Sequence, residues 1–324
     1  MSNVLVCSAG RRVSLVTAFK TELKRLLGNR NSVLACDLYP ELSPACQIAD
    51  QCFETGQFSD IEYVPKLLSA CVERDAKLIV PTLDTELLLL SSNVGQFESA
   101  GTNLVISDYQ LVQKCRDKSK TNELFLQYGF KVPKAIDPQL GQYPFFVKPI
   151  SGSSSQDIYV IRSDEDLAPK LLDGSRFLHM EYLSPDEFDE YTIDLYYDRC
   201  SNLRCAVPRK RIAVRAGEIA KGITEKGALL EKIWSQLGYM GGARGCITLQ
   251  VFVGRTDGEV YGIEINPRFG GGYPLSYQAG ANFPAFLITE YLLDQPIPEF
   301  HDWEENLLFL RYDAEILIHA FDSR

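Results

Sequence analysis

The stretch "GIEINPRFGGGYPLSY" (residues 262–277) places side chains of three different chemistries at alternate positions. In a strand, alternate residues share a face, so Glu264, Asn266 and Arg268 would point the same way. A carboxylate and an amide oxygen side by side suit Mg²⁺, whose coordination shell phosphates and waters then complete. Gln250 would lie beside Glu264 if the strand "ITLQVF" pairs with it in a hairpin around "GRTDGE". Gln250, Glu264 and Asn266 are therefore candidate metal ligands, and a solvated strand face is the alternative.

A second candidate site begins at Lys148, which follows the apolar run "FFV" and precedes the loop "PISGSSSQ". An ammonium group and the free backbone N–H groups of a small-residue loop can together hold a phosphate. The sequence G-x-x-x-x-G-K-[ST] of a Walker A loop is absent. A flexible hairpin tip is the alternative interpretation.

A third candidate lies in "HMEYLSPDEFDEYTID". Glu181, Tyr182 and Leu183 end one predicted strand, and Glu190 begins the next. A short segment between two lobes can present backbone groups to a purine edge, and a carboxylate beyond it can accept hydrogen bonds from ribose hydroxyls. By itself, such an acidic loop is more typical of a solvated surface.

The elements that must position these residues change character along the chain. Predicted strands at 3–8, 32–37, 76–82 and 102–107 alternate with helical segments, which predicts a doubly wound parallel sheet. Ligands bind beyond the carboxyl ends of such strands, and the residues that fall there are Ser8, Gly10, Arg11, Asp37, Thr82, Asp84 and Glu86. A compact α+β region follows, and long strands that look antiparallel begin near residue 188. We place domains at 1–113, 114–185 and 186–324.

Composition excludes several classes of protein. The 324 residues carry a net charge of −10, which argues against a nucleic-acid-binding surface. No secretion signal and no run of about 18 apolar residues is present, so we expect no membrane partner. Nine scattered cysteines without a C-x-x-C pair fit reduced thiols in the cytoplasm. The G-x-G-x-x-G fingerprint of nicotinamide enzymes is missing.

The order and spacing of the candidate segments resemble the ATP-grasp superfamily, and most closely its carbamoyl-phosphate-synthase-like members. The resemblance extends over "RDKSKTNELFLQYGFKVPKA", "FFVKPISGSSSQDIYVI", "MEYLSPDEFDEYTIDLYYD" and "GIEINPRFGGGYPLSYQAGANFP". It implies a mixed α/β and α+β fold, in which a pre-ATP-grasp doubly wound parallel sheet (1–113) precedes a two-lobed ATP-grasp fold. The lobes would be a small lid (114–185) and a large antiparallel-sheet subdomain with the metal site (186–324).

The resemblance also implies a role for each matching residue. The nucleotide-binding residues would be Lys118, Lys148, Ser151, Gly152, Ser153, Ser154, Glu181, Tyr182, Leu183 and Glu190. The two lysines would contact phosphates, the 151–156 loop would close over them, residues 181–183 would meet adenine, and Glu190 would bind ribose. Gln250, Glu264 and Asn266 would hold Mg²⁺, and Arg268 would stabilise the transferring phosphoryl group. Arg211 or Arg215 would line the acceptor side.

The function implied is that of an ADP-forming ligase. ATP and Mg²⁺, which Mn²⁺ could replace, would activate a small-molecule carboxylate as an acyl phosphate for attack by an amine or similar nucleophile. The second ATP-grasp half and the glutaminase portion of carbamoyl-phosphate synthase are not in this sequence, so a different ligation is expected. A homodimer is compatible with this interpretation. The alternatives are a catalytically inactive ATP-binding sensor or partner protein and, more remotely, a nicotinamide oxidoreductase.

Overall fold

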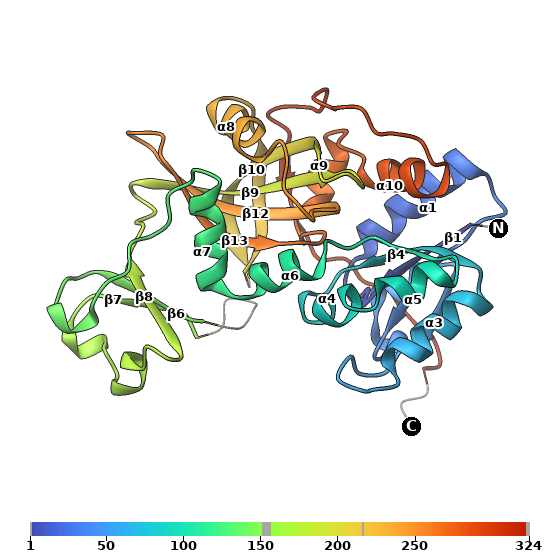
Figure 1. Cartoon of the computed structure of the whole chain (residues 1–324), viewed down its shortest axis with the longest axis horizontal. Helices are drawn as coiled ribbons and strands as arrows, with labels where there is room; N and C mark the ends of the chain where they lie inside the picture. Colours follow the sequence, from blue (N-terminus) through green and yellow to red (C-terminus); the bar gives the residue numbers. More distant parts are fainter. Residues whose placement is uncertain (1, 151–156, 216, 322–324) are drawn as a thin grey trace. The chain divides into compact units, whose positions relative to one another are not determined.

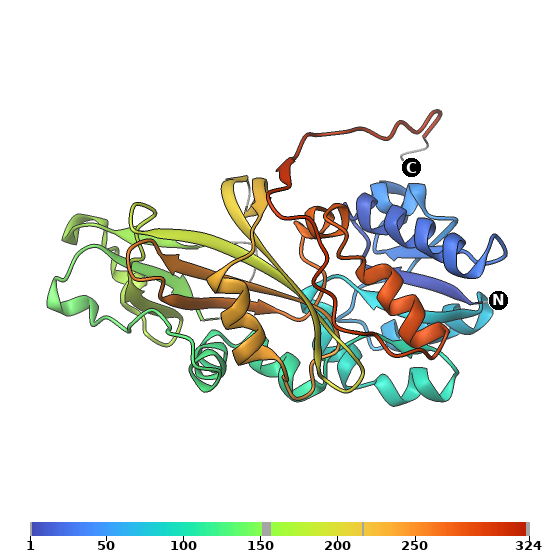
Figure 2. The same cartoon turned by 90° about the horizontal axis from the view of Figure 1, so that it is seen from above.

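The structure is a computed structural model that describes residues 2–150, 157–215 and 217–321. The chain forms two compact units (Figures 1 and 2). The first consists of Met1–Val105, Asn282–Pro296 and Phe309–Arg324, and the second of Ile106–Ala281 and Ile297–Leu308. In the described residues, no helix combines the length and the apolar character needed to cross a membrane.

The first unit is built on a five-stranded parallel sheet with the order β3-β2-β1-β4-β5. Its strands are β1 (Asn3–Cys7), β2 (Val33–Asp37), β3 (Gln51–Glu54), β4 (Ala76–Pro81) and β5 (Asn103–Leu104). The connecting helices are α1 (Val13–Leu27), α2 (Pro44–Ile48), α3 (Tyr63–Glu73), α4 (Asp84–Ser91) and α5 (Val94–Ser99). Every residue of β1 is buried, as expected for a parallel strand covered on both faces. The predicted doubly wound sheet is confirmed.

A helix from late in the chain completes this unit. Helix α10 (Phe283–Leu292) packs against α1, and Figure 1 shows the two helices side by side. The Asn103 Nδ2 atom donates a hydrogen bond to the Tyr291 carbonyl at 3.4 Å. The first unit is therefore discontinuous in sequence. The three-domain division at 113 and 185 stays a prediction.

The second unit contains a six-stranded sheet with the order β13-β12-β9-β10-β11-β14. The strands are β9 (Phe188–Tyr197), β10 (Leu203–Arg215), β11 (Glu218–Thr224), β12 (Gly245–Gly254), β13 (Val260–Asn266) and β14 (Leu308–Leu310). Neighbours from β13 through β11 pair antiparallel. The predicted hairpin around "GRTDGE" is the β12–β13 pair, and the predicted antiparallel strands are confirmed.

One face of this sheet is the hydrophobic core. Ile193, Leu195, Leu249 and Ile265 are buried there among residues of α6 (Tyr109–Arg116), α7 (Lys118–Gln127) and α8 (Ala228–Leu237). Along β9, β12 and β13 these apolar residues alternate with polar ones. The polar side chains therefore point to the opposite face of the sheet. The helices thus cover one side of the sheet and leave its polar side for the candidate site.

A separate three-stranded sheet, β7-β6-β8, holds Lys148. It consists of β6 (Phe145–Pro149), β7 (Tyr159–Ile161) and β8 (Phe177–Glu181), shown in green in Figure 1. The sequence "DEDLAPKLL" (164–172) predicts a single helix, but this is wrong, because two short 3-10 helices, Asp164–Asp166 and Pro169–Leu172, occupy the stretch. Pro169 explains the break, because it lacks an N–H group and disfavours helical backbone at the residue before it.

Candidate active site

The polar face of the six-stranded sheet gathers five of the predicted site residues, namely Glu190, Arg211, Gln250, Glu264 and Asn266. Gln250 lies opposite both Glu264 and Thr192, Thr248 lies opposite Asn266 and Asp194, and Thr192 lies opposite Arg209. Directly opposed residues of antiparallel strands share a face. The resulting polar face consists of Glu190, Thr192, Asp194, Arg209, Arg211, Thr248, Gln250, Glu264 and Asn266.

The predicted metal ligands lie together on this face. Gln250 pairs with Glu264 across β12 and β13, as predicted, and Asn266 lies two residues further along the same strand. The Gln250 Nε2 atom donates a hydrogen bond to Glu190 Oε1, so its amide oxygen remains an acceptor. Among the described residues, no three His, Cys, Asp or Glu side chains cluster closely enough to hold a metal. One carboxylate with two amides fits a hard cation whose remaining ligands come from phosphates and water.

Arg268 does not continue this row. The sequence predicts that it shares a strand face with Glu264 and Asn266, and the structure shows this to be wrong. Strand β13 ends at Asn266, and the Arg268 N–H donates to the Asn266 carbonyl at 2.8 Å in a tight turn. Pro267 lacks the N–H group that would extend the pairing. The Arg268 Nη1 atom donates to the Phe269 carbonyl at 3.1 Å. Its catalytic role stays a prediction.

The three glycines after Arg268 make room for polar side chains. A Cβ at Gly270 would lie 2.8 Å from Thr248 Oγ1, one at Gly271 would lie 2.5 Å from Glu218 Oε1, and one at Gly272 would lie 2.1 Å from Arg209 Nη1. Contacts this short do not occur, so at each position either the turn or the neighbouring side chain would have to move to admit a Cβ atom. The Thr248, Glu218 and Arg209 side chains therefore lie where larger residues at these three positions would place their Cβ atoms.

The two predicted phosphate-binding lysines lie near each other. Lys148 is 7% exposed, and Lys118 Nζ donates a hydrogen bond to the Pro149 carbonyl at 2.7 Å. Burial, helped by the nearby charge of Lys118 and opposed by that of Glu264, lowers the pKa of Lys148 to about 8. Burial also lowers the pKa of Lys118, again against the attraction of Glu264. The structure thus brings both lysines within electrostatic reach of a predicted metal ligand.

The predicted loop over the phosphates, with Ser151, Gly152, Ser153 and Ser154, lies outside the described residues. The predicted adenine-binding segment is described. Glu181 ends β8, and its Oε1 atom accepts a hydrogen bond from the Lys134 backbone N–H at 3.0 Å. The Tyr182 ring lies beneath the Arg162 guanidinium at 5.7 Å, and Leu183 is half-buried. The Glu181 carboxylate therefore helps to fix the segment itself.

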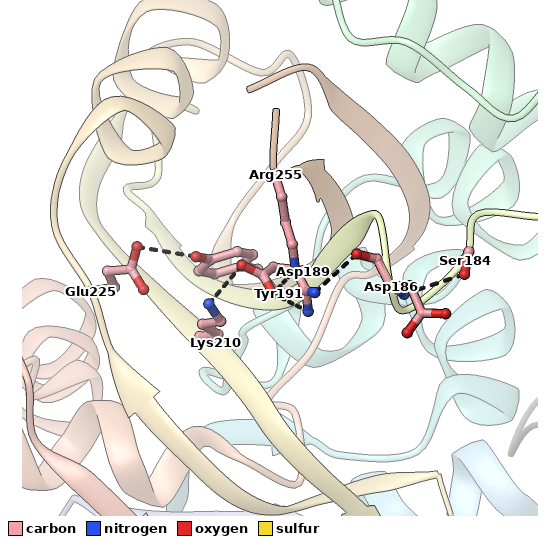
Figure 3. A network of polar contacts seen from close by, with 7 residues as sticks. All are labelled: Ser184, Asp186, Asp189, Tyr191, Lys210, Glu225 and Arg255. Atoms are coloured by element: carbon pink, nitrogen blue, oxygen red, sulfur yellow. Dashed lines mark hydrogen bonds and ion pairs between the residues drawn. The ribbon is translucent and has the colours of Figure 1, made fainter. Parts of the chain in front are cut away.

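A polar network holds the chain between this segment and Glu190 (Figure 3). Asp189 accepts hydrogen bonds from Lys210 Nζ at 2.6 Å and from Arg255 Nε at 3.0 Å. Arg255 Nη1 also donates to the Asp186 carbonyl at 3.0 Å. Burial tends to raise the pKa of Asp189, but the hydrogen bonds from Lys210 and Arg255 outweigh it and hold the pKa below its usual value. The members of this network come from three separate segments, so no local sequence pattern indicates it.

Glu190 joins the predicted ribose site to the metal ligands. Its Oε1 atom accepts hydrogen bonds from both Gln250 Nε2 and Arg211 Nη1, and Arg211 Nη2 donates to the Gly217 carbonyl at 2.9 Å. Of the two predicted acceptor-side arginines, the structure brings Arg211 into this cluster. Arg215 lies exposed at the end of β10, opposite Glu218.

The predicted pocket in the first unit contains a fully buried carboxylate. Glu86 accepts hydrogen bonds from Ser8 Oγ at 2.7 Å, from Tyr63 OH at 2.9 Å and from the Thr82 N–H at 3.2 Å. Burial raises the pKa of Glu86, although these hydrogen bonds oppose the rise. Through Ser8 and Thr82, Glu86 joins the ends of β1 and β4, between which the strand order reverses.

Comparison with known proteins agrees with both units. Residues 4–105 match the family described as "PylC-like, N-terminal domain", and residues 174–310 match "ATP-grasp in the biosynthetic pathway with Ter operon". Comparison with curated proteins gave no match. These two matches and the observed sheets agree with an ATP-grasp fold in which a pre-ATP-grasp domain precedes the ATP-grasp domain. Within that class, its N-terminal domain is PylC-like.

Solved structures share this fold at low sequence identity. The biotin carboxylase domain of Hydrogenobacter thermophilus 2-oxoglutarate carboxylase, a dimer solved with MgADP, ADP and bicarbonate, has a TM-score of 0.71 at 17% identity, covering 95% of this chain and 73% of that one. N5-carboxyaminoimidazole synthetase from Staphylococcus aureus, solved with ADP, gives 0.67 at 17%, covering 95% and 80%. L-amino acid ligase from Bacillus licheniformis gives 0.63 at 17%, covering 90% and 74%.

Proposed function

We propose that this protein is an ATP-dependent ligase that phosphorylates a small-molecule carboxylate and joins it to an amine or similar nucleophile, releasing ADP and phosphate. The structures that share its fold include carboxylating synthetases and an amino acid ligase, several of them solved with ADP. An acyl phosphate is the activated intermediate that this chemistry requires.

The observation that carries the proposal is the pairing of Gln250 with Glu264 on the polar face, with Asn266 beside them and two lysines within electrostatic reach. This arrangement combines oxygen donors for a cation with positive charge for phosphates. A protein that only senses ATP needs the cationic part but not an aligned set of metal ligands. The arrangement therefore favours catalysis over the inactive sensor.

The donor set fits Mg²⁺, and Gln250, Glu264 and Asn266 would hold it. When bound, the ion would neutralise charge that develops on the phosphate oxygens. Lys148 and Lys118 would bind the phosphates, and Arg211 would orient the acceptor carboxylate from its position beside Glu190. Phosphoryl transfer depends mainly on such positioning and charge neutralisation.

The proposed partners are small molecules, and a homodimer is compatible with the proposal. Each of the nine cysteines carries a thiol and not a disulfide bond, which supports a reducing, cytoplasmic location. The net negative charge of the chain argues against a nucleic-acid partner.

The test is a panel of carboxylates and amines scored for release of ADP in the presence of Mg²⁺. Hydroxylamine in place of the amine should trap a hydroxamate of the true acid. Release of AMP and pyrophosphate would show adenylation and contradict the mechanism, and MgATP binding without any turnover would favour the sensor.

A further inference from the structure

A buried ion pair lies on the polar face beside the predicted metal ligands. Asp194 and Arg209 are 0% and 1% exposed. Arg209 Nη2 donates to Asp194 Oδ1 at 2.9 Å, and Arg209 Nε lies 2.9 Å from Asp194 Oδ2. The free energy needed to remove two charges from water is about as large as the free energy of their attraction. An apolar pair of similar size often stabilises a fold equally well. Stability alone is therefore a weak reason for this pair.

The carboxylate of Asp194 accepts hydrogen bonds from two hydroxyls that lie beside the glycine turn, residues 267–272. The Ser276 hydroxyl, on helix α9 (Tyr273–Gln278) just after the turn, donates to Asp194 Oδ2 at 2.6 Å. The Thr248 hydroxyl lies 3.2 Å from Asp194 Oδ1 and 3.1 Å from the Arg268 carbonyl, so it donates to one of them at a time. Asp194 is thus linked to α9 through Ser276, and the Thr248 hydroxyl lies between Asp194 and the Arg268 carbonyl.

Arg209 supports the last residue of the same turn. Its Nη1 atom lies 2.1 Å from the position that a Cβ of Gly272 would occupy, so the Gly272 backbone rests directly on the guanidinium. Among the described residues, this buried Nη1 atom has no hydrogen-bond partner. The ion pair and its two hydroxyls therefore contact the turn near its start at Arg268 and at its end at Gly272, and they also contact the helix that follows.

We propose that Asp194 and Arg209 are positioning residues that hold the glycine turn against the sheet. The turn follows Asn266 directly and contains Arg268. The ion pair therefore fixes the positions of Asn266, the last predicted metal ligand, and of the Arg268 side chain. This inference rests on the proposed function for its catalytic consequence. A displacement of about 1 Å at a reacting group lowers turnover by roughly 10²-fold.

The first experiment measures hydrogen exchange of the backbone amides and needs no substrate. Ser276→Ala and Thr248→Val each remove one hydroxyl link and leave the ion pair in place. Tyr273→Phe is the matched control, because its hydroxyl donates to the Ala281 carbonyl at 2.9 Å from the same helix without contacting Asp194. We expect exchange within 268–272 to accelerate at least tenfold in the two variants and to stay unchanged in Tyr273→Phe. Equal exchange in all three proteins would overturn the proposal.

The second experiment compares kinetics. In Ser276→Ala and Thr248→Val, kcat for ADP release should fall roughly 10- to 100-fold while the KM for ATP stays within about twofold. Thr248→Ser, which keeps the hydroxyl, should restore kcat. A rise in KM without a fall in kcat, or the same loss in Tyr273→Phe, would contradict a positioning role. If no substrate pair is turned over by the wild-type protein, the ligase proposal fails, and the exchange result still decides whether the pair holds the turn.

Discussion

Gln250 and Glu264 face each other across the antiparallel pair β12–β13, with Glu190 hydrogen-bonded to Gln250 from the strand on its other side. Three neighbouring strands thus bring an amide and two carboxyl groups to one point of the sheet. This relationship joins the proposed ribose contact to the proposed metal site. A substitution at one of these sites should therefore also affect the other.

Replacing Glu264 by Ala should abolish Mg²⁺-dependent ADP release and leave the fold intact. A lost metal ligand removes several kcal/mol of transition-state stabilisation, so we expect a loss of roughly 10³-fold or more. Glu259→Ala is the control, since Glu259 is a carboxylate near the same hairpin that pairs with Lys131 at 3.3 Å and is partly exposed. Glu264→Ala activity within about threefold of wild type would exclude Glu264 as a metal ligand.

ATP affinity should depend on pH through Lys148. Its pKa is about 8 in the free protein, so the side chain is charged below pH 8 and must take up a proton to bind phosphate above it. We expect the Kd for ATP to be flat from pH 6.5 to 7.5 and to rise above pH 8, as measured by calorimetry. Lys148→Arg should remove this dependence, because a guanidinium stays charged. A pH-independent Kd in the wild type would show that Lys148 does not contact phosphate.

Removing the charge of Lys148 should change the free energy of unfolding and the affinity for ATP in different ways. The folded pKa lies below the unfolded value of about 10.4, so the folded state binds fewer protons between these values and unfolding free energy rises with pH there. Lys148→Met should flatten this rise and leave the free protein at least as stable as wild type at pH 7. ATP affinity should nevertheless fall roughly 10- to 100-fold, as expected for a lost charged hydrogen bond. Parallel losses of stability and affinity would make Lys148 a structural residue.

Neutralising Asp189 should destabilise the segment before Glu190. Its pKa is held below the usual value, so its stabilising effect is present above about pH 4 and is lost as pH falls through the folded pKa. Asp189→Asn should cost about 1 kcal/mol at pH 7 in urea unfolding, and the difference should vanish near pH 2. A difference that persists at pH 2 would point to a loss unrelated to charge.

Adding one methyl group at Gly272 should disrupt the turn. The new Cβ of Gly272→Ala would meet both Arg209 Nη1 and the Ile219 side chain, and we expect a loss of about 2 kcal/mol or more together with reduced turnover. Gly95→Ala is the matched control, because no atom lies within 4 Å of its Cβ position in helix α5. That substitution should stabilise the protein by up to about 1 kcal/mol. A tolerated Gly272→Ala would show that the turn can move freely.

Sequence patterns predicted the parts of the site that depend on local regularity. The alternation of β13 and the short loop before it are enough to place Gln250 beside Glu264, and an apolar strand ending in lysine is enough to single out Lys148. Arg268 could not be placed by alternation, because Pro267 ends the strand first. The burial of Arg209 was also beyond reach, since "PRKR" offers three cations and only the paired strand, with Asp194 on it, decides which one is buried.

The position of α10 has a consequence for how the protein is made. The helix that packs on α1 lies at residues 283–292, although the five strands of the sheet in that unit end at Leu104. The strands of the N-terminal sheet are therefore synthesised before the last helix that covers them. The ribosome adds roughly 180 residues in between, which takes on the order of ten to forty seconds. During that interval an apolar surface on α1 is uncovered, so the nascent chain is a natural client for chaperones that bind before synthesis is complete.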